Sequence, residues 1–417
     1  MRHEARAPRT RCRLALGAGL ALAVLSLAMR AAADEPRRLT MEEALAMAEK
    51  APLAQASALE VQRVRAEGRG AGLLPNPEVQ FDREAAGEEV ERIAAFSMAL
   101  PLNGRLGLER AAARSALTAA ERRARQGRIE RRGRVGELFV ELVAAQERDR
   151  VLEAGRNRLD GLVRVLRARE AHGESSGYDR MRAEQEYAEL MAQRLEARAA
   201  LARARTELAS LLGLTSEPLV ANGTLEAPRT PVPSAEEARA QAAARGDVEA
   251  FSAEADQRDL LGRAAGRRTL PEPALAVGRK TACAAAACDS GLTLGFAVSL
   301  PLFDRGQGPR AALHAEANLA RARRHILALG AQAEADAALA EVHAGREAEA
   351  ALAQAPSAER LVAIAQAAYE AGEMRIFELL DAHRTALSAS LRATEIRLST
   401  RKAELALDVA TGTERVP

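Results

Sequence analysis

Apolar positions recur every three or four residues through most of the chain, which is the spacing of helices that pack side by side. Residues 105–171 contain no proline and carry this spacing at Val135, Leu138, Leu142, Ala145, Leu152, Leu159, Val163 and Leu166. We predict one continuous helix here, which at about 1.5 Å per residue would extend about 100 Å. Leu391, Leu398 and Leu405 repeat at heptad spacing near the end of the chain. The pattern predicts a mainly helical protein with coiled-coil contacts.

Short regions of each half switch from helical spacing to strict alternation, which is typical of β-strands. The clearest one alternates apolar Leu292, Leu294, Phe296, Val298 and Leu300 with small or polar Thr293, Gly295, Ala297 and Ser299. Residues 91–100 alternate in the same way and follow a shorter alternating stretch at 78–83. Such strands fit a barrel wall with lipid on one side and water on the other. They also fit a half-buried sheet in a soluble domain.

The two halves of the chain repeat one another at an offset of about 200 residues, which indicates duplication of one structural unit. The matched features are segments 75–77 and 271–273, 96–102 and 296–302, and 170–174 and 370–373, together with the capping boxes Thr40/Glu43 and Ser234/Glu237. We therefore predict a first repeat at 34–214, a linker at 215–233 and a second repeat at 234–417. Proline, glycine and threonine are frequent in the linker.

Each repeat is expected to contain a helix, two strands, a long helix and a shorter helix. The expected bounds are 40–72, 78–83, 91–100, 105–171 and 178–212 in the first repeat, and about 307–371 for the long helix of the second. Two shorter helices placed end to end would match the length of one long helix. Unequal pieces would then form a tube wall of uniform length.

The N-terminus resembles a secretory signal peptide, which we place at residues 1–33. Several arginines precede an apolar run at 14–29, and Ala31, Ala32 and Ala33 provide a small-residue cleavage site. The run is too short to span a membrane comfortably, and no other segment approaches about 18 continuous apolar residues. Membrane insertion by the mature chain would therefore use β-strands.

Two cysteines, Cys283 and Cys288, lie beyond the predicted signal peptide, in a small-residue stretch at 281–291 that we interpret as loop-like. A local disulfide between them is expected in an oxidising compartment. Metal binding by the pair is less expected, because no histidine or second cysteine pair is near.

Composition argues against an enzyme or a nucleic-acid binder. Basic and acidic residues number 60 and 58 and are interleaved, and aromatic residues make up only 2% of the chain. A nucleic-acid binder would show a basic face with stacking aromatics. The glycines at 68, 70 and 72 follow a helix rather than a strand, so they do not form a dinucleotide-binding loop. We expect no catalytic site, no cofactor and no resident metal.

Four strands are too few to close a barrel, and lipid does not tolerate an open sheet edge. A membrane location therefore requires several copies to share one wall. Three copies would supply twelve strands and twelve columns of stacked helices.

The order and duplication of the motifs resemble the TolC-type outer-membrane efflux family over nearly the whole mature chain. The resemblance rests on the Leu-Thr-x-x-Glu-Ala-Leu opening at 39–45, the two Pro-x-Pro strand entries, the two Leu-Pro-Leu strand exits and the segments around 169–174 and 369–373. The sequence from Gly372 to Ala382 is most similar to that of the heavy-metal, CzcC-like branch of this family.

The resemblance implies a homotrimer in outer-membrane lipid of a Gram-negative-type cell, with a twelve-stranded β-barrel and a long periplasmic α-barrel. A periplasmic adaptor (membrane-fusion protein) and an inner-membrane pump would be its partners. The helix–helix turns would form the adaptor-docking tip, at Gly173, Glu174, Gly372 and Glu373. The periplasmic gate would comprise Asp179, Tyr369, Glu378 and Asp381, whereas Met374 stands where the family's locking arginine is expected and Arg375 follows it.

Two other functions share these features. The outer-membrane channel of a type I protein-secretion system has the same fold. A soluble periplasmic coiled-coil adaptor would also be secreted, helical and poor in aromatics, but adaptors have a single helical hairpin flanked by many short strands.

Overall fold

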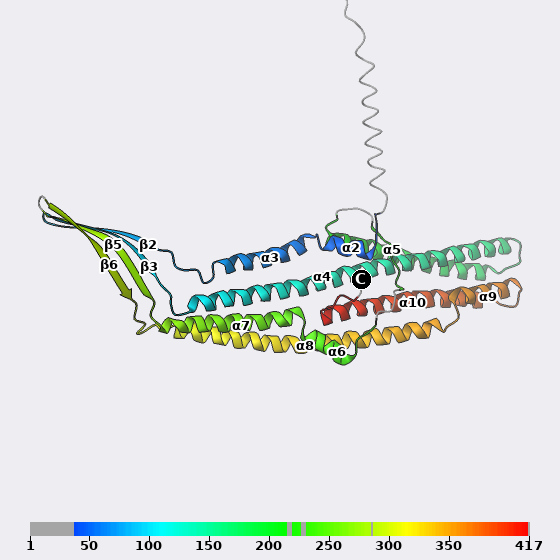
Figure 1. Ribbon diagram of the computed structural model, residues 1–417. Helices are drawn as coiled ribbons and strands as arrows, with labels where there is room; N and C mark the ends of the chain where they lie inside the picture. Colours follow the sequence, from blue (N-terminus) through cyan, green and yellow to red (C-terminus); the bar gives the residue numbers. More distant parts are fainter. Residues whose placement is uncertain (1–36, 215–218, 227–230, 285–286, 416–417) are drawn as a thin grey trace, which may run out of the picture.

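The computed structural model describes residues 37–214, 219–226, 231–284 and 287–415. The predicted signal peptide (1–33) and part of the predicted linker lie outside these residues. The molecule is elongated, with four long strands at one end and helices running parallel to its long axis through the rest (Figure 1).

Nine helices in the described residues form the body. They are α2 (Met41–Ala48), α3 (Pro52–Arg69), α4 (Arg105–Ala171), α5 (Gly177–Leu212), α6 (Ala235–Ala243), α7 (Gly246–Gly266), α8 (Gln307–Ala353), α9 (Ala358–Glu370) and α10 (Ile376–Thr411). The predicted helix at 105–171 is present as α4, which runs the length of the body. α3 and α5 lie one after the other along α4, and α7 lies between α4 and α8 (Figure 1). A long helix is thus matched by shorter ones placed in line.

Two predicted helices are interrupted, and proline accounts for both corrections. The predicted helix at 40–72 is α2 followed by α3, with Pro52 in the first turn of α3. The predicted helix at about 307–371 ends at Ala353, and α9 begins after Pro356 with Ser357 as its N-cap. Proline lacks the N–H that continues a helix, but it is well tolerated where a helix starts.

The strands form one antiparallel sheet in the order β2-β3-β5-β6. Their bounds are β2 (Glu78–Ala86), β3 (Glu89–Ala99), β5 (Pro273–Ala284) and β6 (Ala287–Val298), so the first pair is longer than the predicted 78–83 and 91–100 at the hairpin end. Each half of the chain contributes one hairpin, and the pairing of β3 with β5 joins the halves.

A small parallel pair was not predicted from the sequence. β1 (Arg37–Leu39) pairs with β4 (Leu219–Ala221), which lies within the predicted linker. The Gln146 side chain of α4 forms two hydrogen bonds with the backbone of β4. Its Nε2 donates to the Ala221 carbonyl at 3.0 Å, and its Oε1 accepts from the Ala221 N–H at 2.8 Å. Both short strands, β1 and β4, are thereby fixed to the middle of α4.

Glycines allow α4 to approach α10 closely near the middle of the molecule. A Cβ atom at Gly133 would lie 2.4 Å from Val409 Cγ2, and one at Gly136 would lie 2.9 Å from Leu405 Cδ2. Real carbon atoms do not approach this closely, so a Cβ at either position would require the facing side chain of α10 to shift. This contact fixes the C-terminal half of α10 against α4.

Replacing Gly133 by alanine is expected to lower the thermal unfolding midpoint, because overpacking a tight contact costs about 1–3 kcal/mol. The matched control is Gly161→Ala in the same helix, where a Cβ would meet nothing within 4 Å. That substitution should stabilise α4 by about 0.5–1 kcal/mol through helix propensity. Circular dichroism during heating measures both effects. Equal midpoints for the two variants would contradict the close packing.

Candidate functional site

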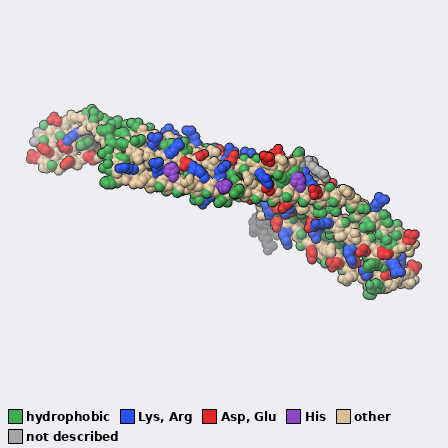
Figure 2. Space-filling view, turned by 90° about the horizontal axis from the view of Figure 1, so that it is seen from below, with side chains coloured by type: hydrophobic (Ala, Val, Ile, Leu, Met, Phe, Trp, Pro, Cys, Tyr) green, Lys and Arg blue, Asp and Glu red, His purple; other side chains and the backbone are tan. Residues whose placement is uncertain are grey.

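The part of the four-stranded sheet nearest the helices has an apolar face that the described helices leave exposed, whereas Arg279, Arg83 and Arg92 lie on the same face farther toward the hairpin ends. Strand register places Val79, Phe96, Val277 and Leu294 in one row across all four strands. A second row contains Met98, Leu275 and Phe296. Val79 is 83% exposed and Leu294 is 78% exposed. Figure 2 shows hydrophobic side chains gathered at this end of the molecule. A contiguous apolar surface of this kind marks contact with a membrane or a protein partner.

The opposite face of the sheet carries small or polar side chains. The row behind the first apolar row is Gln80, Ala95, Gly278 and Thr293. At Gly278 a Cβ atom would lie 2.6 Å from the Ala94 carbonyl oxygen, so the backbones are too close there for a side chain. The alternation predicted from the sequence therefore places apolar and polar residues on separate faces of one sheet.

The edges of this sheet are the outer sides of β2 and β6, which pair with no other described strand. An exposed strand edge presents unpaired N–H and C=O groups that can pair with another chain. Within the described residues, every helix is too short or too polar to cross a membrane.

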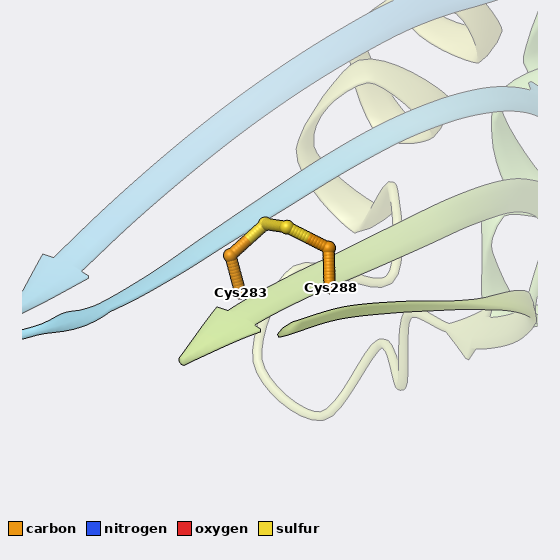
Figure 3. Close-up of a disulfide and its surroundings, with 2 residues drawn as sticks. All are labelled: Cys283 and Cys288. Atoms are coloured by element: carbon orange, nitrogen blue, oxygen red, sulfur yellow. A yellow bond between two sulfur atoms is a disulfide. The ribbon is translucent and has the colours of Figure 1, made fainter. Parts of the chain in front are cut away.

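A disulfide joins Cys283 and Cys288 at the end of the β5–β6 hairpin (Figure 3). The prediction of a loop-like stretch at 281–291 was wrong, because both cysteines lie in strands and face each other in register. Their Cα atoms are 4.1 Å apart, the separation of a close cross-strand pair. In the described part of the chain, no three His, Cys, Asp or Glu side chains gather into a metal site.

At the other end of the molecule, two helix–helix turns have the same backbone geometry. Gly173 and Gly372 have φ of 76° and 75°, in the left-handed region that favours glycine. In each turn the residue after the glycine donates its backbone N–H to a carbonyl in the last turn of the preceding helix and so caps that helix. The Glu174 N–H donates to the Arg169 carbonyl at 2.8 Å, and the Glu373 N–H donates to the Ala368 carbonyl at 2.9 Å. We call these two turns the tip; the side chains of Glu174 and Glu373 are exposed there.

The predicted gate residues lie on three helices, with Tyr369 on α9. Glu378 and Asp381 are exposed on α10, and Asp179 is half-buried in the first turn of α5, where Ser176 caps the helix. Glu378 Oε2 also accepts a hydrogen bond from the Arg375 N–H at 2.9 Å, so this carboxylate caps α10. The partner of Tyr369 is Arg169, whose guanidinium carbon lies 5.5 Å from the ring centroid.

Two cation–π contacts and one ion pair connect the α4–α5 hairpin to the α9–α10 hairpin near the tip. In addition to Arg169 and Tyr369, the Arg182 guanidinium carbon lies 4.6 Å from the centre of the Phe377 ring. Arg384 of α10 forms an ion pair with Glu186 of α5. Sequence reasoning missed Arg169 and Arg182, because their partners lie about 200 residues away and no local spacing indicates them.

Comparisons with known proteins agree with this geometry. No family model matches the chain. The cobalt-zinc-cadmium resistance protein CzcC of Cupriavidus metallidurans is 28% identical over 430 residues, which cover 95% of this chain and 98% of CzcC.

Solved structures with a similar fold include two channels. CusC is 19% identical, with a TM-score of 0.73 over 90% of this chain and 92% of its own. The CmeC outer-membrane channel of Campylobacter jejuni is 16% identical, with a TM-score of 0.74 over 89% of this chain and 85% of its own. The resemblance to TolC-type efflux proteins that the motifs predicted is confirmed, as is the predicted fold class.

Replacing Arg182 by alanine should loosen the tip. Arg182 is half-buried and Phe377 is exposed. A cation–π contact near the surface contributes about 0.5–1 kcal/mol, so amide exchange in the two turns should accelerate about two- to fivefold. Hydrogen–deuterium exchange of the turn peptides measures the change. Arg182→Lys keeps a cation over Phe377 and should retain most of the protection. Unchanged exchange in the alanine variant would show that the contact does not hold the hairpins together.

Proposed function

We propose that the protein is the outer-membrane channel of a tripartite efflux pump, a passive exit duct formed by three copies. The observation that carries the proposal is the four-stranded sheet, whose exposed apolar face is backed by a face of small and polar residues. In a membrane the apolar face contacts lipid and the other face lines water. Each copy supplies four strands, and three copies supply the twelve strands of a closed wall.

The helical body forms the periplasmic part of the duct. α4 alone has 67 residues, and at about 1.5 Å per residue it extends about 100 Å from the sheet. The sheet and the tip lie at opposite ends of the molecule (Figure 1). With the sheet in the outer membrane, the tip reaches through the periplasm toward the inner membrane.

The tip is the surface on which an adaptor protein and, through it, an inner-membrane pump would assemble. Gly173 and Gly372 make the two turns compact, and Glu174 and Glu373 project from them. Because the two turns have matching backbone geometry, three copies present six similar docking points around one axis.

Divalent metal cations are the substrate class that we favour. The curated relative is named for cobalt, zinc and cadmium resistance. In a trimer, each exposed acid near the tip becomes a ring of three, and acidic rings favour cations in a narrow aqueous path. Glu378 and Asp381, one turn apart on α10, are the acids that we assign to this role, with Asp179 on the neighbouring hairpin.

The alternatives are less well supported. A soluble adaptor would not expose apolar rows that cross all four strands of a sheet, because that surface would aggregate in water. A protein-secretion channel shares the fold, but the resistance named in the relative concerns ions rather than polypeptides.

Substituting Phe296 by arginine tests which face of the sheet meets lipid. A charge on the lipid face costs about 2–4 kcal/mol at the membrane midplane, so this variant should yield fewer trimers and less conductance in planar bilayers. The matched control is Ala297→Arg, the next residue on the same strand, whose side chain lies on the opposite face. It should still form conducting trimers. Equal loss in both variants, or a wild-type protein that remains a monodisperse monomer without detergent, would contradict the proposal.

Neutralising the two acids on α10 tests the gate. Glu378→Gln keeps a side-chain acceptor for the Arg375 N–H and removes the charge, so α10 should keep its cap. Combined with Asp381→Asn, it should lower cation preference or raise conductance in planar bilayers. Glu395→Gln on the same helix removes an exposed acid from a pair with Arg392 and is expected to change neither property. If the double variant conducts like the wild type, these acids are ordinary surface charges.

A further inference from the structure

His383 lies in α10 at three- and four-residue spacing from two apolar side chains. Leu380 and Leu387 lie three residues before it and four residues after it, and both belong to the packing between α4, α5 and α10. His383 Nε2 is buried and has no hydrogen-bond partner. An unpaired polar atom destabilises a packed interface, so a histidine here weakens a contact that leucine would strengthen.

Two cavities meet at this histidine. One, of about 430 Å³, lies between α4, α5 and α10, and the other, of about 690 Å³, lies between α4 and α9. His383 and Arg158 of α4 line both cavities. The seam between α4 and α10 is therefore open on both sides at this level, in contrast to the close glycine contacts nearer the sheet.

The charged groups around His383 come from every neighbouring helix. They are Arg158 and Arg169 on α4, Glu186 and Glu189 on α5, Glu359 and Glu370 on α9, and Arg384 on α10 itself. Three of the four carboxylates have other partners: Glu186 pairs with Arg384, Glu189 accepts from Gln193, and Glu370 accepts from Gln366. Burial lowers the pKa of His383, and the positive charge of Arg158 lowers it further.

We propose that His383 is the pH-sensing residue of the periplasmic gate: its protonation places a second positive charge beside Arg158 and drives the α4–α5 and α9–α10 hairpins apart. The inference rests on the proposed channel function. The packed arrangement favours the neutral form of His383, because burial and Arg158 lower its pKa below the ordinary histidine value of about 6.5. A separated, hydrated His383 takes up a proton more readily. The packed arrangement is therefore fully stable above about pH 6.5 and loses stability as pH falls from there toward the lowered pKa.

The first experiment records conductance of the trimer in planar bilayers from about pH 7.5 to about pH 5.5, on either side of the ordinary histidine pKa. Wild-type conductance should rise on acidification. His383→Leu should remove the rise and stay at the low level, and it should fold well because leucine occupies the adjacent core positions. His172→Gln, which removes an exposed histidine at the tip, is the matched control and should keep the wild-type response.

The second experiment separates an electrostatic role from a structural one. Histidine titration by NMR, assigned through the His383→Leu variant, should show the His383 pKa below the ordinary value and moving up in Arg158→Gln. Arg156→Gln, two residues away, should leave it unchanged. The acid-induced rise in conductance should also shrink in Arg158→Gln.

The outcomes distinguish the inference from the function on which it rests. Any of three results would overturn the inference alone. They are a wild-type conductance that does not depend on pH, a His383→Leu channel whose conductance still rises in acid, and a His383 pKa that is unchanged in Arg158→Gln. A wild-type protein that conducts at no pH would overturn the proposed function and the inference with it.

Discussion

Backbone N–H and C=O groups at the edge of a sheet must be paired when the sheet enters lipid. The proposed assembly of the whole molecule depends on this requirement. No water is present in the hydrocarbon to satisfy them, and each unpaired group costs several kcal/mol. The four-stranded sheet has an apolar face suited to lipid, yet β2 and β6 each have an outer edge without a described partner. Closure by further copies removes both edges at once, with β2 of one copy beside β6 of the next. The pore is then a property of the assembly.

In the proposed trimer the helical body forms a duct, and the packing of its helices differs between the middle of the molecule and the tip. Near the middle, glycine contacts and ion pairs hold α10 to α4; Lys402 of α10 donates to Glu137 and Glu141 of α4. Desolvation lowers the pKa of Lys402, but the hydrogen bonds to these carboxylates outweigh it and the net pKa is raised. Toward the tip, a cavity lies between α4, α5 and α10, and Arg182 of α5 contacts the Phe377 ring of α10. Movement is therefore expected at the tip, while the middle stays fixed.

The main elements of the fold were predictable because their signals are local. Alternation at 292–300 and the proline-free stretch at 105–171 each specify an element without reference to the rest of the chain. The three-residue strands β1 and β4 are too short to carry a pattern, and they depend on Gln146 of α4. Residues 281–291 were predicted to be loop-like because their small side chains show no clear alternation of apolar and polar residues. In the structure, pairing with β3 extends β5 as far as Ala284.

At the tip, the sequence predicts the two turns but not the contacts between the two hairpins. Glycine at 173 and 372 could be predicted, because a tight turn needs left-handed backbone. The partners of Tyr369 and Phe377 could not, because they depend on how two hairpins from separate halves of the chain pack together. His383 did carry a signal, a polar residue at three- and four-residue spacing from two leucines, which becomes informative only once its surroundings are known.

Electron cryomicroscopy of the protein in lipid nanodiscs tests the shared wall most directly. The account predicts three copies around one axis, with β2 of each copy hydrogen-bonded to β6 of its neighbour and lipid density against Phe296 and Leu294. Single copies with free sheet edges, or an apolar face packed against protein rather than lipid, would contradict it.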